Sequence, residues 1–361
     1  MERKRILITA AGSEIANPVI KALKMSDLHL DLIGVDIEPF SSGLFKTNKS
    51  YLVPRASSRN YVEVLKRICK DNKVNLIIPG SDVELSVLSQ INESGLFNSK
   101  IVVSSPEVIS ITRDKKNTYE FFKQFNLPFV MTTSYDNVNE LINSCGFPII
   151  AKPKSGSASC GVHVLFDYDE FNNSDWDNYV FQDFLVDKNK YGNKKNITIS
   201  DCYDGGKLIQ EKEISVQVNV SSTGELIGTF ISENTLKAGM PVKIYPFKDK
   251  EIEKVIKSMA NKLIDIGLRG PCNFQCKLTC NGLYVFEINP RFTGITGVRH
   301  VVGYKECVAA VCDYVFDYSK LQLEKILQTD YNKVISRFYD EVIFDKSQLI
   351  ELEHKKVLVN E

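Results

Sequence analysis

The first 110 or so residues of this 361-residue chain alternate short apolar segments with segments of helical spacing. Apolar runs of about five residues between turn residues are typical of buried strands. Helices that alternate with such strands indicate parallel βαβ units. We therefore expect an N-terminal α/β domain with a parallel sheet, whose strands lie at residues 5–9, 30–36, 51–54, 75–79 and 100–104.

This alternation is typical of a Rossmann-like domain, so the loop after the first strand raises the question of dinucleotide binding. Only Gly12 stands where a Gly-x-Gly-x-x-Gly motif needs three glycines, so pyrophosphate could not approach the backbone as that motif requires. Asp36 ends the second strand, where it could bind a ribose or be an ordinary strand-end acid. We do not expect NAD binding.

The overall composition is that of a soluble globular protein, with 43% hydrophobic and 25% charged residues. The length predicts two or three domains. Lys+Arg and Asp+Glu both number 45, which argues against a nucleic-acid surface or a polybasic membrane anchor. No apolar run approaches the ~18 residues of a membrane helix, and the apolar residues 6–8 are too few for a signal peptide. We expect a cytoplasmic protein.

The nine cysteines, an odd number scattered along the chain, predict reduced thiols. Cys272, Cys276 and Cys280 recur every fourth residue, but they lack a Cys-x2-Cys pair and a nearby histidine. We expect small buried side chains rather than zinc ligands.

A carboxylate, an amide and a guanidinium follow one another at the end of the strand-like segment 282–286. Side chains alternate along a strand, so Glu287, Asn289 and Arg291 share one face. Pro290 discourages continuation of a central strand. Oxygen ligands beside a cation suit a divalent metal that carries phosphates. The alternative is a solvated strand end before a turn.

Gln275 lies on the strand that we expect to pair with this one. It would place a third oxygen side chain beside Glu287 and Asn289. Three such oxygens could hold Mg²⁺, which keeps water and nucleotide phosphates as its other ligands.

A loop of glycine and serine at residues 155–161 lies between two expected strands. Its backbone N–H groups and hydroxyls suit phosphate oxygens, although such a loop is also an ordinary flexible hairpin. Lys152 ends the strand that enters the loop, and Lys115 opens the preceding helix. Two lysines there could neutralise a nucleotide's charge, although either alone could be a solvated surface residue.

In the order and spacing of its motifs, the chain resembles the ATP-grasp superfamily. It is most similar to the branch related to the large subunit of carbamoyl-phosphate synthetase, which includes many stand-alone carboxylate–amine ligases. The resemblance runs from about residue 4 to about residue 305. Its markers are individually weak and jointly specific: Ser105–Ile109 with Arg113–Lys115, Lys152–Pro153 with 155–162, Gln182–Leu185, 213–216, Asn273–Gln275 and Glu287–Arg291.

The resemblance implies a mixed α/β and α+β fold in four parts. A Rossmann-like pre-ATP-grasp domain occupies residues 1–112. ATP-grasp subdomain A, with the phosphate loop, follows at 113–182, and subdomain B, with the metal site, at 183–305. Residues 306–361 form a C-terminal extension that we expect to pack on the ATP-grasp domain.

The resemblance also implies roles for individual residues. Arg291 and Lys152 are the implied catalytic residues. Lysines reach the phosphates, the glycine-rich loop closes over them, the segment 182–185 lies beside the adenine, and an acid lies near the ribose. The implied metal ligands are Gln275, Glu287 and Asn289. The implied nucleotide-binding residues are Lys115, Lys152, Gly156, Ser157, Ser159, Gly161, Gln182, Asp183, Phe184, Leu185, Glu213 and Lys237.

The implied cofactors are ATP and Mg²⁺, with Mn²⁺ as an alternative ion. The implied partners are a small carboxylate and an amine, with neither nucleic acid nor membrane, and a homodimer is left open. Gln275 stands where many family ligases have an acid, and Asp183 stands where glutamate is commoner. The segment 187–210 separates the hinge from Glu213 by far more than usual, and it could be a lid, a substrate loop or a contact surface.

The implied reaction begins with attack of a carboxylate on the γ-phosphate, which gives an acyl phosphate and ADP. An amine then displaces phosphate and forms an amide. We interpret Cys160 as a loop residue rather than a nucleophile. Two alternatives stay open, namely phosphorylation of carbamate or another small acid, and a nucleotide-binding regulatory protein without turnover. Arg299 could clamp a substrate carboxylate or serve the fold.

Overall fold

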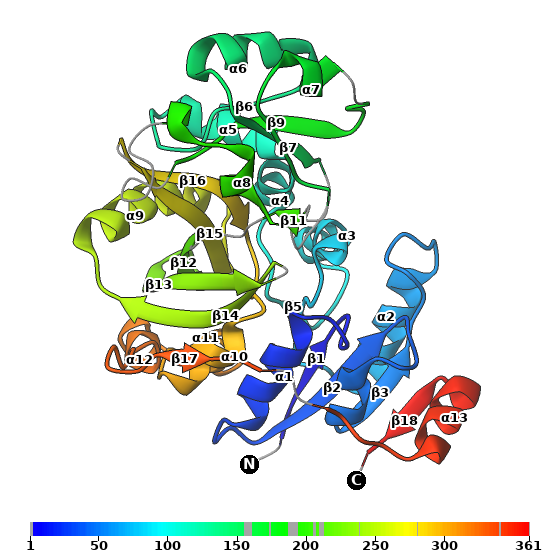
Figure 1. Cartoon of the computed structure of the whole chain (residues 1–361). Helices are drawn as coiled ribbons and strands as arrows, with labels where there is room; N and C mark the ends of the chain where they lie inside the picture. Colours follow the sequence, from blue (N-terminus) through cyan, green and yellow to red (C-terminus); the bar gives the residue numbers. More distant parts are fainter. Residues whose placement is uncertain are drawn as a thin grey trace.

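Two six-stranded sheets and one four-stranded sheet carry the fold in the described part of the chain (Figure 1). No described helix is both long enough and apolar enough to cross a membrane. The computed structural model describes residues 3–154, 161–172, 175–186, 194–204, 207–208, 213–237, 239–279, 281–338 and 341–360.

The N-terminal sheet has the order β18-β3-β2-β1-β4-β5, and β3 to β5 run parallel as predicted. Ile6 and Ile8 pack on one face with α1, and Leu7 packs on the other with α2 and α3, because strand side chains alternate. The bounds are β1 (Lys4–Ile8), α1 (Ala16–Lys24), β2 (Leu30–Asp36), β3 (Lys49–Leu52), α2 (Tyr61–Asp71), β4 (Leu76–Ile78), α3 (Asp82–Ser94) and β5 (Lys100–Ile101).

The end of the chain joins this N-terminal sheet, which differs from the expectation that all of 306–361 packs on the ATP-grasp part. The strand β18 (Val357–Val359) runs antiparallel to β3 and covers an edge that would otherwise expose unpaired backbone groups. Leu358 is buried in the same core as β1, as is Leu352 of α13 (Lys346–Lys355). Figure 1 shows both elements beside β3.

A four-stranded antiparallel sheet, in the order β6-β9-β7-β8, forms a separate layer at the top of Figure 1. Lys115 opens a helix as expected, because Asp114 accepts N–H bonds from Lys116 and Asn117 and so caps α5. The bounds are α4 (Pro106–Arg113), α5 (Lys115–Lys123), β6 (Thr132–Thr133), α6 (Val138–Cys145), β7 (Ile149–Pro153), β8 (His163–Leu165), α7 (Tyr168–Asn172) and β9 (Tyr179–Asp183).

The second six-stranded sheet is antiparallel, in the order β16-β15-β12-β13-β14-β17. Its apolar face packs against α9 and includes Cys272 and Cys276, which are buried as predicted. Its other face carries polar side chains on β12 and β15, including Gln217 and Asn273, and the buried Phe230 on β13. The bounds are β12 (Glu213–Val220), β13 (Leu226–Lys237), β14 (Met240–Phe247), α9 (Lys250–Asp265), β15 (Gly270–Thr279), β16 (Gly282–Asn289) and β17 (Ile335–Ser336).

Short elements connect and flank these layers. The helix α11 packs its Cys307 and Val311 against the N-terminal core, whereas Leu323 of α12 packs with Phe230 of β13. The remaining bounds are η1 (Ser42–Lys46), η2 (Tyr135–Asn137), η3 (Lys194–Asn196), α8 (Ile199–Cys202), β10 (Tyr203–Asp204), β11 (Lys207–Leu208), α10 (Thr296–Val301), α11 (Glu306–Phe316) and α12 (Lys320–Ile326).

The contribution of β18 to the N-terminal core can be measured with two neighbouring substitutions. Leu358→Ala should lower the free energy of unfolding by about 2–5 kcal/mol, because it leaves a cavity in the core. Val359→Ala, at an exposed neighbour, should change it by less than about 0.5 kcal/mol. Urea unfolding of both variants checks this, and equal effects would show that β18 does not anchor the sheet.

Candidate functional site

The three predicted metal ligands lie together where β15 pairs with β16. The register places Gln275 opposite Glu287 and Asn273 opposite Asn289. The Nδ2 atom of Asn289 donates to Glu287 Oε1 at 3.3 Å. Among the described residues no three His, Cys, Asp or Glu side chains cluster as a metal site would require. A cation here would therefore rely on amide oxygens as well as Glu287, which is the hard oxygen donor set that suits Mg²⁺.

Two lysines approach Glu287 from other elements. Lys115, the first residue of α5, places its Nζ 3.7 Å from Glu287 Oε2. Lys152 is the last residue but one of β7, and its Nζ lies 4.7 Å from the centroid of the Phe286 ring. Burial and, to a lesser extent, the neighbouring charge of Lys115 together lower the pKa of Lys152 to about 8, although the attraction of Glu287 opposes them. A polyphosphate bound here would stabilise the charged form of both lysines.

Glu213, the first residue of β12, shares this environment. Burial, with a smaller contribution from repulsion by Glu287, raises its pKa from 4.5 to about 8, although Lys152 opposes both effects. The site thus combines acids and lysines whose charges are only partly matched. Perturbed titratable groups of this kind gather at functional sites.

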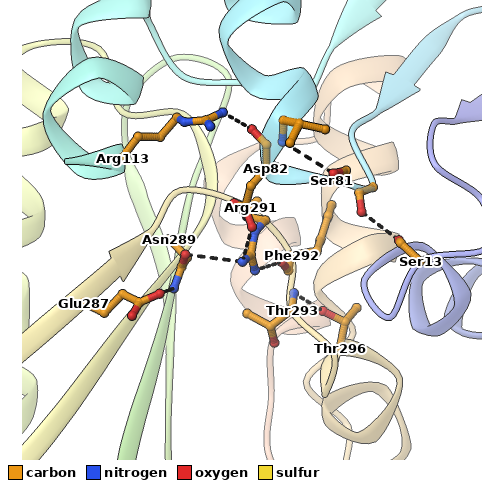
Figure 2. A network of polar contacts seen from close by, with 12 residues as sticks. Ser13, Ser81, Asp82, Arg113, Glu287, Asn289, Arg291, Phe292, Thr293 and Thr296 are labelled. Carbon is orange, nitrogen blue, oxygen red and sulfur yellow. Dashed lines mark hydrogen bonds and ion pairs between the residues drawn. The ribbon is translucent and has the colours of Figure 1, made fainter. Parts of the chain in front are cut away.

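Arg291 leaves the end of β16 and binds the N-terminal domain. Its Nε and its NH2 group contact the two carboxylate oxygens of Asp82 at 2.6 and 2.7 Å (Figure 2). The NH2 group also donates to Asn289 Oδ1 at 3.3 Å. This bidentate geometry fixes the guanidinium beside the predicted metal ligands.

Asp82 is a site residue that the sequence analysis missed. It is the first residue of α3, directly after the N-cap Ser81 and the carboxyl end of β4. In open parallel sheets, ligands bind outside the carboxyl ends of the strands. The position of Asp82 after a predicted strand was therefore a usable signal.

The predicted adenine hinge connects β9 to neighbouring elements. The amide nitrogen of Gln182 donates to Thr132 Oγ1 at 3.0 Å and to the carbonyl of Phe286 at 3.4 Å. Asp183 pairs with Lys194. The ring of Phe184 lies 5.6 Å from Lys277 Nζ, and Leu185 packs against the core beneath the second sheet. The hinge residues thus lie on the same side of the fold as Lys152 and Phe286.

Several of the remaining predicted residues are not described by the structure. Gly156, Ser157, Ser159 and Cys160 lie outside the described residues, as do 187–193, 205–206 and 209–210 of the expected insertion at 187–210. Gly161 is described and has a φ of 70°, which favours glycine. Lys237 is exposed at the last position of β13. The roles of all these residues stay predictions.

Glu213 gives the site a pH dependence without any ligand. Because its folded pKa is raised, the stabilisation from its proton is complete below pH 4.5 and is lost as the pH rises through about 8. Glu213→Gln should remove this loss. Melting temperatures of nucleotide-free protein from pH 5 to 8 should therefore diverge in favour of the variant, whereas exposed Glu225→Gln should follow the wild type. Parallel curves of melting temperature against pH for all three proteins would contradict the raised pKa of Glu213.

Sequence comparison relates the chain to two groups of proteins. Residues 6–102 match the family described as PylC-like, N-terminal domain. The chain is 24% identical over 279 residues to the carbamoyl phosphate synthase large chain of Clostridium botulinum (strain Alaska E43 / Type E3). That match covers 75% of this chain and 24% of the relative, so the chain spans about a quarter of the length of the curated relatives it matches.

Solved structures of similar fold cover most of the chain. N5-carboxyaminoimidazole synthetase from Staphylococcus aureus, complexed with ADP, has a TM-score of 0.63 at 15% identity over 87% of this chain and 78% of that one. The biotin carboxylase domain dimer of the Hydrogenobacter thermophilus 2-oxoglutarate carboxylase, in complex with MgADP and bicarbonate, has a TM-score of 0.61 at 15% identity over 90% and 70%. At these identities the likeness concerns the fold.

Proposed function

We propose that the chain, which has the ATP-grasp fold and a Rossmann-like N-terminal domain, is an ATP-dependent carboxylate–amine ligase. It would form an amide bond through an acyl phosphate and release ADP and phosphate. The observation that carries this proposal is the convergence of Lys115, Lys152 and Glu213 on Glu287, next to the amides of Gln275 and Asn289. Such a cluster suits a nucleotide polyphosphate with a divalent cation.

Mg²⁺ would be held by Glu287, Asn289 and Gln275, with Mn²⁺ as the alternative ion. When bound, it would neutralise phosphate charge. The lysines provide the remaining positive charge, because Lys115 and Lys152 already lie around Glu287. Arg291, held by Asp82, would stabilise the charge on the phosphoryl group as it moves to the substrate.

The chemistry follows from the poor leaving-group character of a carboxylate oxygen. The substrate carboxylate attacks the γ-phosphorus, the bond to the β-phosphate oxygen breaks, and ADP departs with that electron pair. The amine then attacks the acyl carbon, the bond to the phosphate oxygen breaks, and a proton leaves the nitrogen. The protein contributes position and charge and needs no covalent nucleophile.

The known complexes support the nucleotide and the metal. The similar structures contain ADP in one case and MgADP with bicarbonate in the other. The second is a dimer, and we extend the hypothesis of a homodimer to this chain. A cytoplasmic location stays part of the proposal. The acid and the amine are to be found by experiment.

The direct test measures the release of ADP from ATP in the presence of each acid of a panel, with and without amines. A ligase releases ADP only when its acid is present, and hydroxylamine added in place of the amine traps the acyl phosphate as a hydroxamate. Hydroxamate formed with carbamate or another small acid, but no amide with any amine, would favour the acid-phosphorylating alternative. A protein that binds ATP and never releases ADP across the panel would favour the regulatory alternative.

Glu287→Ala should lower the rate of ADP release by about 10³-fold or more, because it removes the only carboxylate among the three proposed metal ligands. The variant should stay folded, since the Glu287 side chain is partly exposed and outside the core. Glu253→Ala, on the helix that covers the opposite face of the sheet, is the matched control and should keep wild-type turnover. Wild-type turnover in Glu287→Ala would refute the metal-site assignment.

Asp82→Asn tests whether the N-terminal domain positions Arg291. The substitution keeps the side-chain shape but removes the charge that fixes the guanidinium. We expect kcat to fall by about 10²-fold while KM for ATP changes little, because the lysines at the phosphates are untouched. Exposed Asp71→Asn, in the same domain, should have no effect. An increase in KM for ATP with unchanged kcat would assign Asp82 to nucleotide binding instead.

A further inference from the structure

The polar face of the second sheet continues past the proposed metal site. The register places Asn289 opposite Asn273, and Asn273 opposite Gln217, so these three side chains form one row across β16, β15 and β12. Neighbouring strands lie about 4.8 Å apart, so Gln217 lies about 10 Å from Asn289 along this row. This separation is within the length of a small substrate whose reacting group lies at the metal site.

Gln217 is fully buried, and neither of its amide atoms has a hydrogen-bond partner among the described residues. Native proteins seldom leave a buried amide unpaired, because the group gives up its hydrogen bonds to water. The neighbouring Asn219, on the same face, shows the usual arrangement, since its Nδ2 donates to the hydroxyl of Tyr304 at 2.8 Å. Gln217 therefore differs from Asn219, the other buried amide on its strand.

A buried guanidinium lies near the same point. Phe230 pairs with Gln217 across β12 and β13, and the guanidinium carbon of Arg299 lies 5.9 Å from the centroid of the Phe230 ring. Arg299 is fully buried. Its Nε donates to Glu306 Oε1 at 2.7 Å and its NH2 group to Thr293 Oγ1 at 2.8 Å. Its NH1 group and Glu306 Oε2 have no partner among the described residues.

We infer that Gln217 and Arg299 form a substrate subsite for a carboxylate that does not react. The activated carboxylate must lie at the metal site, about 10 Å away along the row, so the group bound here is a second one. The unpaired N–H groups of Arg299 and Gln217 suit carboxylate oxygens. The unpaired oxygens of Gln217 and Glu306 suit an N–H donor beside that carboxylate, as in an amino acid. The inference rests on the proposed function for the position of the reacting group.

Binding can be measured without turnover. Thermal shift and calorimetry in the presence of MgADP would compare the standard amino acids, succinate and glutarate with their carboxamides. We expect binding only by molecules that carry the free second carboxylate. Binding by amino acids but not by succinate or glutarate would assign the adjacent N–H donor as well. Equal binding of carboxylates and carboxamides, or binding by none, would overturn the subsite.

Two substitutions separate a ligand site from an imperfect core. Gln217→Met removes a buried unpaired amide, so it should raise the melting temperature of the free protein and weaken binding of the carboxylate ligand by about tenfold or more. Thr229→Val is the matched control. Its hydroxyl is also buried and unpaired among the described residues, but it faces the opposite side of β13. It should raise the melting temperature without changing affinity.

The outcomes distinguish a failure of the subsite from a failure of the proposed ligase function. Carboxylate binding that is lost in Gln217→Met supports the subsite even if ADP is never released, in which case only the ligase proposal fails. ADP release with acids regardless of a second carboxylate would retain the ligase and overturn the subsite. Unchanged affinity in Gln217→Met, or a lower melting temperature, would show that the amide is paired through buried water and would overturn the subsite.

Discussion

The pairing register of β15 and β16 is the constraint on which the site depends. It places Gln275 beside Glu287 on the polar face and Ile288 on the face that packs against α9. A slip of one residue would turn Glu287 and Asn289 into the core and Ile288 outward. The burial of Ile288 and Phe274 therefore holds the register, and through it the position of the polar side chains. The register shifts between Gln275 and Cys276. The pairing that positions the site is therefore confined to residues 273–275 and 287–289.

The electrostatics around Glu287 are unfavourable to the folded chain alone. Burial lowers the pKa of Lys152 and raises the pKa of Glu213. Both shifts favour the uncharged form of the group. Sites that bind charged ligands commonly depart from the pattern that would stabilise the free protein best. A bound polyphosphate and cation would provide the missing opposite charges. The same reasoning applies to the buried amide of Gln217, whose lost hydrogen bonds to water a ligand in the proposed subsite would replace.

The fold was largely predictable because its signals are local. Alternating strands and helices predicted the N-terminal parallel sheet, and the motif order predicted the ATP-grasp fold that the structural likeness confirms. The alternation of side chains along β16 predicted that Glu287 and Asn289 share a face. The contact of Asp82 with Arg291 joins residues 209 positions apart, which no local pattern encodes. The strand of Val357–Val359 is too short for a periodic signal, so its pairing with β3 was missed.

The pairing of β18 with β3 also has a consequence for how the chain acquires its structure. Leu358 pairs with Ser50, roughly three hundred residues earlier in the chain, and contacts between such distant segments form slowly. During synthesis the N-terminal domain would emerge with the edge of β3 unpaired, and that edge would stay unpaired until residues 357–359 had been made. An exposed strand edge invites pairing with other chains. Nascent chains of this protein would therefore be most vulnerable to aggregation at β3, and early engagement of chaperones at that edge would protect them.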